Sequence, residues 1–167
     1  MHLTEVDGAP TRISVVIPAR NEEDDIEEAL TSVLHQRGVD VQVIVVNDGS
    51  TDRTGGIVDR MAESNSRITV IHNPVLASGW LGKPNAMNHG VAAATADTIL
   101  FTDADVIHAP TSFATGLREL RKRELDLLSF FPLTVCESFW ENVCIPLPLG
   151  PFTVQFAMGA DDPKSPN

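Results

Sequence analysis

Residues 13–54 read ISVVIPARNEEDDIEEALTSVLHQRGVDVQVIVVNDGSTDRT, and this stretch decides the fold class. It opens with a β-branched run, Ile13–Ile17, closed by Pro18, which suits a strand end because it has no N–H to donate. Apolar residues then recur at helical spacing from Ile26 to Leu34. A nearly continuous apolar run follows at Val41–Val46, typical of a strand buried on both faces of a parallel sheet. Strand, helix and strand in this order predict one unit of an α/β domain.

The starts of the first two helices carry side chains that accept hydrogen bonds from free backbone N–H groups. Asn21 is predicted to cap the first helix, with Asp24 at the third helical position as in a capping box. Ser50 or Thr51 is predicted to cap the second helix. Both helix N-termini would then lie at one end of the sheet.

The rest of the chain continues the alternation of strands and helices. Further strands are predicted at Ile68–Ile71, Thr98–Thr102 and Leu125–Phe130, with one helix starting near Pro84 and another spanning Pro110–Arg123. We therefore predict an α/β fold with a Rossmann-like, mostly parallel sheet flanked by helices. In such sheets ligands bind beyond the carboxyl ends of the strands.

Composition limits the class of partner. The chain has 167 residues, a length typical of one domain, and its 12 Lys and Arg against 23 Asp and Glu give a net charge of −11. Because binding to nucleic acid depends on clustered Lys and Arg, a nucleic acid is excluded as the primary partner. Hydrophobic residues make up 43% of the chain, enough to form a buried core.

Cysteine usage and the N-terminus indicate the compartment. Cys136 and Cys144 match neither a redox pair nor a zinc site, and buried thiols are the favoured interpretation. Because the N-terminus lacks an apolar signal segment, we predict a cytoplasmic protein. The apolar region Leu127–Ala160 is broken by four prolines, so it is not predicted to span a bilayer. Peripheral contact with the inner face of the cell membrane stays open.

Two carboxylates follow the strand predicted at Thr98–Thr102. Asp103 and Asp105 are one residue apart, so on an extended backbone they leave the same side, with small Ala104 between them. Such a pair can share Mg²⁺ or Mn²⁺, with the remaining ligands supplied by water and a substrate diphosphate. A solvated turn is the alternative, and the position directly after an apolar strand favours the metal site.

Two more polar clusters fall at predicted strand ends. Asp48 follows the strand Val41–Val46 and can accept hydrogen bonds from a base or a ribose, or simply belong to an Asx turn. After the first strand, Arg20 can stack on a base or pair with phosphate. Surface pairing of Arg20 with Glu23 or Asp24 is equally compatible with the sequence.

The loop Ser78–Lys83, with sequence SGWLGK, places Lys83 at the start of a helix between glycines that permit close backbone approach. It lacks the spacing of a Walker A loop, and the chain has no GxGxxG fingerprint, which argues against a P-loop NTPase and a Rossmann dehydrogenase. Trp80 is either a sugar platform or a loop anchor. His108, near the carboxylate pair, is interpreted as a surface or loop histidine in preference to a site residue.

Four blocks, in series, resemble a known family: VVIPARNEEDDIEEALTSVL, VIVVNDGSTDRT, GWLGKPNAMNHG and ILFTDADV. Their order and spacing are similar to those of the inverting, nucleotide-sugar-dependent glycosyltransferases of family 2, which have the GT-A fold. The resemblance covers residues 13–106, the expected nucleotide-sugar-binding core. GWLGK and the later ESFWENVCIPLPLG are similar to the hopanoid-associated, HpnB-like branch, near the ceramide-glucosyltransferase-like enzymes.

The resemblance implies a nucleotide-diphosphate sugar donor, UDP-sugar first, and a Mg²⁺ or Mn²⁺ cofactor. It implies direct displacement at the anomeric carbon, in which a carboxylate base deprotonates the acceptor hydroxyl. For the branch named above, the resemblance also implies that the acceptor can be a lipid. Carried over by motif, the implied site residues are Pro18, Ala19, Arg20 and Glu22 around the nucleotide, Asp48 at the base, Lys83 at the ribose or diphosphate, and Asp103 with Asp105 at the ribose and metal.

The chain departs from the family pattern after Val106. Neither the ED-like pair that supplies the base nor a QxxRW-like element is recognisable there. Glu137 and Glu141 have the wrong context, and Asp161–Asp162 lies in residues 161–167, predicted to be a disordered tail. We therefore expect residues 1–167 to be one truncated GT-A domain that carries the donor half of the site and lacks the general base.

Two alternatives are weighed against this interpretation. A catalytically inactive nucleotide-binding or interaction module would keep the fold without the transfer. A sugar-nucleotide pyrophosphorylase-like protein is disfavoured, because PARNEE stands where that class has a Gly-rich GxGxR loop.

Overall fold

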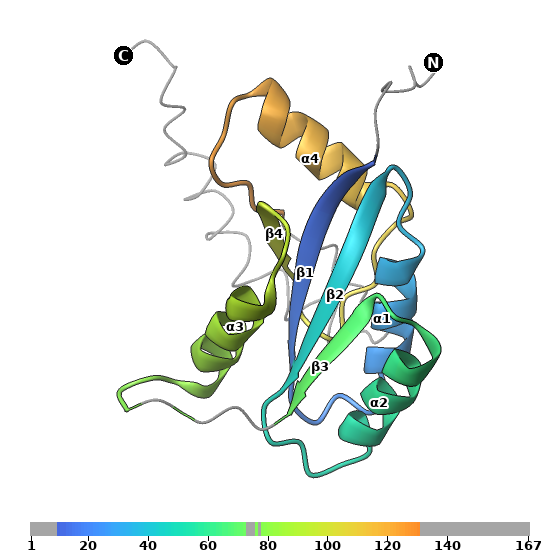
Figure 1. Ribbon diagram of the computed structural model, residues 1–167, viewed down its shortest axis with the longest axis vertical. Coiled ribbons are helices and arrows are strands. Elements are labelled where there is room, and N and C mark those ends of the chain that lie inside the picture. The colour runs from blue at the N-terminus through green and yellow to red at the C-terminus, as the bar shows by residue number, and fades with distance from the viewer. Residues whose placement is uncertain (1–9, 73–75, 77, 131–167) are drawn as a thin grey trace, which may run out of the picture. The chain divides into compact units, whose positions relative to one another are not determined.

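The computed structural model describes residues 10–72, 76 and 78–130. Strands and helices alternate along the chain (Figure 1): β1 (Thr11–Ala19), α1 (Ile26–Leu34), β2 (Val39–Asn47), α2 (Thr54–Ser64), β3 (Ile68–His72), α3 (Gly82–Ala93), β4 (Thr98–Phe101) and α4 (Ser112–Lys122). Two compact units divide the chain after Ser129, and all these elements belong to the first. Cys136, Cys144, Glu137, Glu141 and the predicted tail 161–167 lie outside the described residues.

The strands form one parallel sheet, as predicted, and their order in it is β3-β2-β1-β4. From β1 the chain winds through α1 and α2 to one edge, then returns through α3 to place β4 on the other side of β1. Carboxyl ends of β1 and β4 are therefore neighbours where the winding direction reverses. At such a reversal the connecting segments diverge and leave a crevice, the usual ligand site of open α/β sheets.

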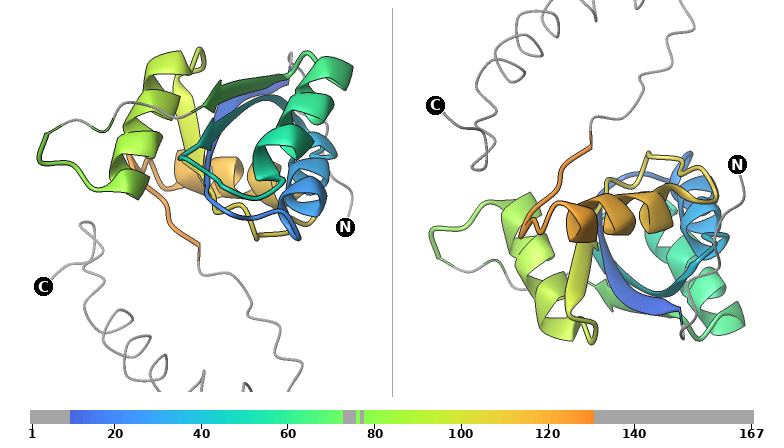
Figure 2. Two further views of the ribbon diagram at one scale, coloured as in Figure 1. Left: turned by 90° about the horizontal axis from the view of Figure 1, so that it is seen from below. Right: turned by 90° about the horizontal axis from the view of Figure 1, so that it is seen from above.

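Both faces of the central strands are buried. Val15, Ile17, Val43 and Val45 face a core shared with α1, α2 and α4, while Val16, Ile44 and Val46 face α3. Figure 2 shows α3 on one side of the sheet and α1 with α2 on the other. Burying each such side chain contributes roughly 1.5–3 kcal/mol, which explains why β1 and β2 are nearly uninterrupted runs of Val and Ile.

Helix α3 lies unusually close to β1. A Cβ on Gly90 would overlap Cγ1 of Val16 and lie 3.2 Å from its Cγ2. Val16 is fully buried. Gly90 thus permits the close approach of the later part of α3 to the sheet.

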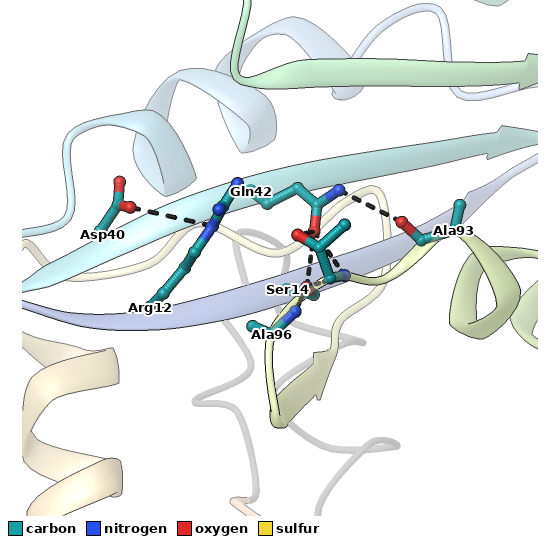
Figure 3. A network of polar contacts seen from close by, with 7 residues as sticks. Arg12, Ser14, Asp40, Gln42, Ala93 and Ala96 are labelled. Atoms are coloured by element: carbon teal, nitrogen blue, oxygen red, sulfur yellow. Dashed lines mark hydrogen bonds and ion pairs between the residues drawn. The ribbon is translucent and has the colours of Figure 1, made fainter.

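A partly buried polar network fastens the end of α3 to the central strands (Figure 3). Ser14 Oγ donates to Gln42 Oε1 at 2.7 Å, and Gln42 Nε2 donates to the carbonyl of Ala93 at 3.2 Å. The Thr95 N–H donates to Gln42 Oε1 at 3.0 Å, and the Ala96 N–H donates to Ser14 Oγ at 3.1 Å. The network sets the position at which β4 begins. It therefore also sets where the segment after β4 leaves the sheet.

The strand predicted at Leu125–Phe130 is wrong, because these residues form no strand. Helix α4 instead ends in a Schellman motif, with Glu124 in the left-handed region at φ 52°. The Leu125 N–H donates to the Leu120 carbonyl at 2.9 Å. This turn directs the chain away from the sheet and leaves Leu127 83% exposed.

Among the residues that the structure describes, every helix is too short or too polar to cross a bilayer.

Candidate functional site

One pocket, of about 420 Å³, forms where the segments after β1, β2 and β4 meet the start of α3. All eight side chains predicted as site residues line it, although they come from four separate segments. The full lining is Pro18, Ala19, Arg20, Glu22, Asp48, Gly82, Lys83, Asp103, Ala104 and Asp105. The sheet therefore brings together in space what the sequence keeps up to 87 positions apart.

The acidic side of the pocket comes from the segments that follow β4 and β1. Ala104 is only 2% exposed and packs into the core, so its neighbours Asp103 and Asp105 extend into the pocket. Glu22 reaches the same space. Burial, followed by repulsion from Asp105, raises the pKa of Glu22. Carboxylates that repel one another in this way favour the binding of a cation between them.

Lys83 supplies a positive charge at the same place. It lies in the first turn of α3, and its Nζ is 2.6 Å from Asp103 Oδ1. Both side chains are more than half exposed, at 59% and 55%, so the ion pair is solvated and can exchange partners. Arg20, also exposed, has no ion-pair partner within the described part of the chain, so neither suggested pairing, with Glu23 or with Asp24, is present; Glu23 is bonded to Arg53 instead.

Asp48 is positioned by backbone contacts. Its N–H donates to the Ala19 carbonyl at 2.9 Å, which continues the pairing of β1 with β2, and Gly49 turns the chain at φ 69°. The Asp48 carboxylate lies against Gly82, where a Cβ would be 2.6 Å from Oδ2. Gly82 is thus a site residue for a steric reason, because any side chain there would displace Asp48.

The predicted helix caps are wrong. Helix α1 begins at Ile26 with Asp25 as its N-cap residue, and α2 begins at Thr54 after Arg53, neither with a side-chain cap. The predicted cap residues link the loop after β1 to the loop after β2. Three successive N–H groups, those of Asn21, Glu22 and Glu23, donate to Ser50 Oγ (3.1 Å), Thr54 Oγ1 (2.8 Å) and Asp52 Oδ2 (3.2 Å), respectively.

A second chain of hydrogen bonds holds the turn that carries Asp48. The Ser50 N–H donates to Asn47 Oδ1 at 3.1 Å, so the Asn47 Nδ2 donates to His72 Nδ1, also at 3.1 Å. His72 then carries its proton on Nε2 and donates it to Asp59 at 2.8 Å. Sequence reasoning missed this relay because its members come from β2, β3 and α2.

His108 does not line the pocket. Its Nε2 lies 2.9 Å from Thr102 Oγ1, and its ring contacts Phe113 edge-on with centroids 4.8 Å apart. Burial lowers the pKa of His108. The prediction that His108 is not a site residue agrees with this placement, although the ring is half-buried and not on the surface.

The donor set suits a divalent cation that is only partly coordinated by protein. Within residues 10–72, 76 and 78–130, no group of three or more His, Cys, Asp or Glu is arranged to hold a metal. Asp103 and Asp105 nevertheless supply two carboxylates to one pocket. Mg²⁺ typically takes one or two carboxylates and completes its shell with water and substrate phosphate, so these residues fit such an ion.

A parallel sheet with a charged pocket at its point of reversal is typical of ligand-binding proteins of the open α/β class. Residues 14–143 match the family model of Glycosyl transferase family 2. Because this match covers most of the chain, the protein belongs to glycosyl transferase family 2.

Curated relatives support the same family. The chain is 36% identical over 116 residues to the uncharacterized glycosyltransferase EpsJ of Bacillus subtilis (strain 168), covering 70% of this chain and 32% of the relative. It is 37% identical over 132 residues to 4,4'-diaponeurosporenoate glycosyltransferase of Staphylococcus aureus (strain USA300), covering 78% of this chain and 34% of the relative. The chain therefore spans about a third of the length of these relatives.

Solved structures agree in fold. The mannosyltransferase PcManGT from Pyrobaculum calidifontis, in complex with GDP-Man and Mn²⁺, superposes with a TM-score of 0.57 at 31% identity, covering 68% of this chain and 35% of that one. S. aureus TarS 1-349 in complex with UDP-GlcNAc gives a TM-score of 0.58 at 25% identity, covering 78% and 38%. The predicted fold class, the α/β arrangement of GT-A glycosyltransferases, is confirmed.

Proposed function

We propose that this chain carries the donor-binding half of a glycosyltransferase that uses a nucleotide-diphosphate sugar, with UDP-sugar as the first candidate. The observation that carries the proposal is the single pocket lined by all eight predicted residues. Two solved relatives contain such donors, GDP-Man in PcManGT and UDP-GlcNAc in TarS. We assign the nucleotide-sugar-binding core to residues 13–106.

The proposed roles follow the sides of the pocket. Pro18, Ala19, Arg20 and Glu22 border the nucleotide, and Asp48, held against Gly82, contacts the base. At the end of the pocket near α1, the nucleotide is expected to contact side chains and not backbone N–H groups. The N–H groups of residues 21–23 are already bonded to the neighbouring loop.

The diphosphate is assigned to the opposite side of the pocket, at the start of α3. Lys83 exchanges its ion pair with Asp103 for the diphosphate there. The N-terminus of α3 adds a favourable dipole, and its N-cap residue, Leu81, has no side chain that could accept a hydrogen bond from the first N–H groups of the helix.

Asp103 and Asp105 are the residues that would hold Mg²⁺ or Mn²⁺, and Asp103 also reaches the ribose. When bound, the cation supplies charge neutralisation for the departing diphosphate. Mn²⁺ is present with the donor in the PcManGT structure. The pair leaves room for such an ion because the residue between its members, Ala104, is small and buried in the wall of the pocket.

The reaction we propose is inverting displacement, with the general base supplied from outside the described residues. We assign the acceptor to the lipids and the enzyme to the hopanoid-associated branch, at the inner face of the membrane. Two exposed apolar side chains directly before Gly82 support an apolar contact beside the pocket: Leu81 is 76% exposed and Trp80 44% exposed.

Isothermal titration of the chain with UDP in the presence of Mn²⁺ tests donor binding. Asp103→Asn is expected to weaken binding more than about tenfold, or about 1.4 kcal/mol, because it removes a charge from the cation site. Asp97→Asn is the matched control, since Asp97 is an exposed carboxylate before β4 that does not line the pocket. An unchanged titration curve for Asp103→Asn would refute the proposed role of Asp103 in holding the metal ion.

A UDP-sugar hydrolysis assay run beside the titration separates enzyme from binding module. Turnover supports the transferase and refutes the catalytically inactive nucleotide-binding module, whereas binding without turnover is expected both of a donor half that lacks its general base and of that module.

A further inference from the structure

Asn21 stands between two pocket residues, Arg20 and Glu22, but does not line the pocket itself. Its backbone is in the left-handed region at φ 58°. Both its side chain and its backbone are bonded to the loop after β2: the Thr51 N–H donates to Asn21 Oδ1 at 2.8 Å, and the Asn21 backbone N–H donates to Ser50 Oγ at 3.1 Å. These reciprocal bonds join loops 30 positions apart in sequence.

Asparagine suits both demands of this position. Left-handed backbone costs most residues roughly 1–2 kcal/mol, whereas Asn tolerates it and Gly adopts it freely. Gly, however, would lack the Oδ1 that accepts from Thr51. The left-handed turn also presents the next N–H, that of Glu22, to Oγ1 of the buried Thr54 at 2.8 Å.

We propose that Asn21 is a positioning residue for nucleotide binding: it holds the loop 20–23 against the loop 50–54, so that Arg20, Glu22 and Asp48 face the pocket together. The inference rests on the proposed function, since it concerns the same donor site. Pairing of β1 with β2 ends at Ala19 and Asn47, and the Asp48 N–H adds one more bond to Ala19. Beyond that point the orientation of the loops depends on bonds such as those of Asn21.

This placement separates a positioning role from a purely structural one. The β1–β2 pairing and the core beneath it do not involve Asn21, so loss of Oδ1 leaves them intact. Loss of Oδ1 should therefore change the free energy of nucleotide binding more than the free energy of unfolding. A residue that only stabilised the fold would change the melting temperature and the affinity together.

The test compares Asn21→Gly with Asn65→Gly in the full chain. Asn65 is a matched control because its Oδ1 also accepts one backbone N–H, that of Arg67 at 3.1 Å, and it does not line the pocket. UDP with Mn²⁺ is the probe in isothermal titration, beside thermal melting and amide hydrogen exchange. We expect Asn21→Gly to weaken UDP binding about fivefold or more, with a melting shift no larger than that of the control. Exchange protection of the Thr51 amide falls as well.

Two further variants keep the inference falsifiable. Asn21→Asp retains the Oδ1 acceptor and tolerates the same φ, so protection of the Thr51 amide recovers. Ser50→Ala removes the reciprocal acceptor from the other loop and weakens UDP binding in the same direction, which decides the question should Asn21→Gly fail to fold.

The outcomes distinguish the two proposals. Wild-type protein that binds no UDP overturns the proposed donor site and this role with it. Wild-type binding together with undiminished affinity in Asn21→Gly, despite lost protection at Thr51, overturns only the positioning role.

Discussion

Gly90→Ala sets two physical effects of opposite sign against each other. Gly90 lies inside α3, where alanine normally stabilises a helix by about 0.8–1.0 kcal/mol relative to glycine. At this position, however, the added Cβ would overlap Val16 Cγ1 and lie 3.3 Å from Val16 Cβ. Val16 is fully buried in β1, a strand paired on both sides, so it cannot move away.

The steric effect should dominate. Overpacking of a core costs about 1–3 kcal/mol, and contact with three atoms of one β-branched side chain places this substitution near the upper value. Subtracting the gain in helix propensity leaves a net loss of about 2 kcal/mol. For a chain of this length, that corresponds to a fall in melting temperature of about 4–8 °C.

Gly56→Ala is the matched control for this prediction. Gly56 is an exposed residue of α2, and the nearest atom to an added Cβ would be Arg60 Nη1, 3.9 Å away. Only the propensity gain applies there, so its melting temperature should rise by about 2–4 °C. Thermal and urea unfolding of the two variants beside the wild type measure the difference. If Gly90→Ala were stabilised like Gly56→Ala, the close packing of α3 on β1 would be refuted.

Two other perturbations probe charges near the pocket. Lys83→Gln should tighten binding of Mn²⁺ alone about fivefold, because it removes a repulsion of roughly 1 kcal/mol beside Asp103, and should weaken UDP binding roughly threefold, because it removes a counter-charge of the diphosphate. If the affinities for Mn²⁺ and for UDP changed in the same direction in Lys83→Gln, this account would be contradicted. His108 has a lowered pKa in the folded chain, so its neutral form contributes stability above the unfolded pKa of about 6.5, and this stability is lost as the pH falls. In urea unfolding between pH 7.5 and 5.5, His108→Gln should therefore lose less stability than wild type, and equal losses would argue against burial as the cause.

The central part of the fold was predictable because its signal is local. Ile13–Ile17 and Val41–Val46 are apolar on both faces, a pattern that only a strand between two helical layers satisfies, and the structure extends each run by a few residues. Leu125–Phe130 is also mainly apolar, but it has no β-branched residue and follows the left-handed turn at Glu124. Propensity does not encode that turn, because Glu rarely adopts a positive φ.

The gathering of the predicted site residues in one pocket was predictable for a topological reason, but the hydrogen bonds around that pocket were not. Polar residues after parallel strands meet at one edge of the sheet, which is enough to bring Asp48 and Asp103 into one pocket. The sequence does not show which partner an Asn or Ser oxygen will choose. At Asn21 a bond to the helix that follows and a bond to a loop 30 residues away use the same atom, and only tertiary packing selects the second.

The charge balance of the pocket links its two expected ligands. The pocket holds four carboxylates, those of Glu22, Asp48, Asp103 and Asp105, against only two cations, in a chain of net charge −11. One of the two, Lys83, is already paired with Asp103. A diphosphate entering alone would meet net repulsion, and a divalent cation entering alone would lack most of its ligands. Each therefore supplies what the other needs, and by thermodynamic linkage the cation must tighten nucleotide binding by the same factor as the nucleotide tightens binding of the cation.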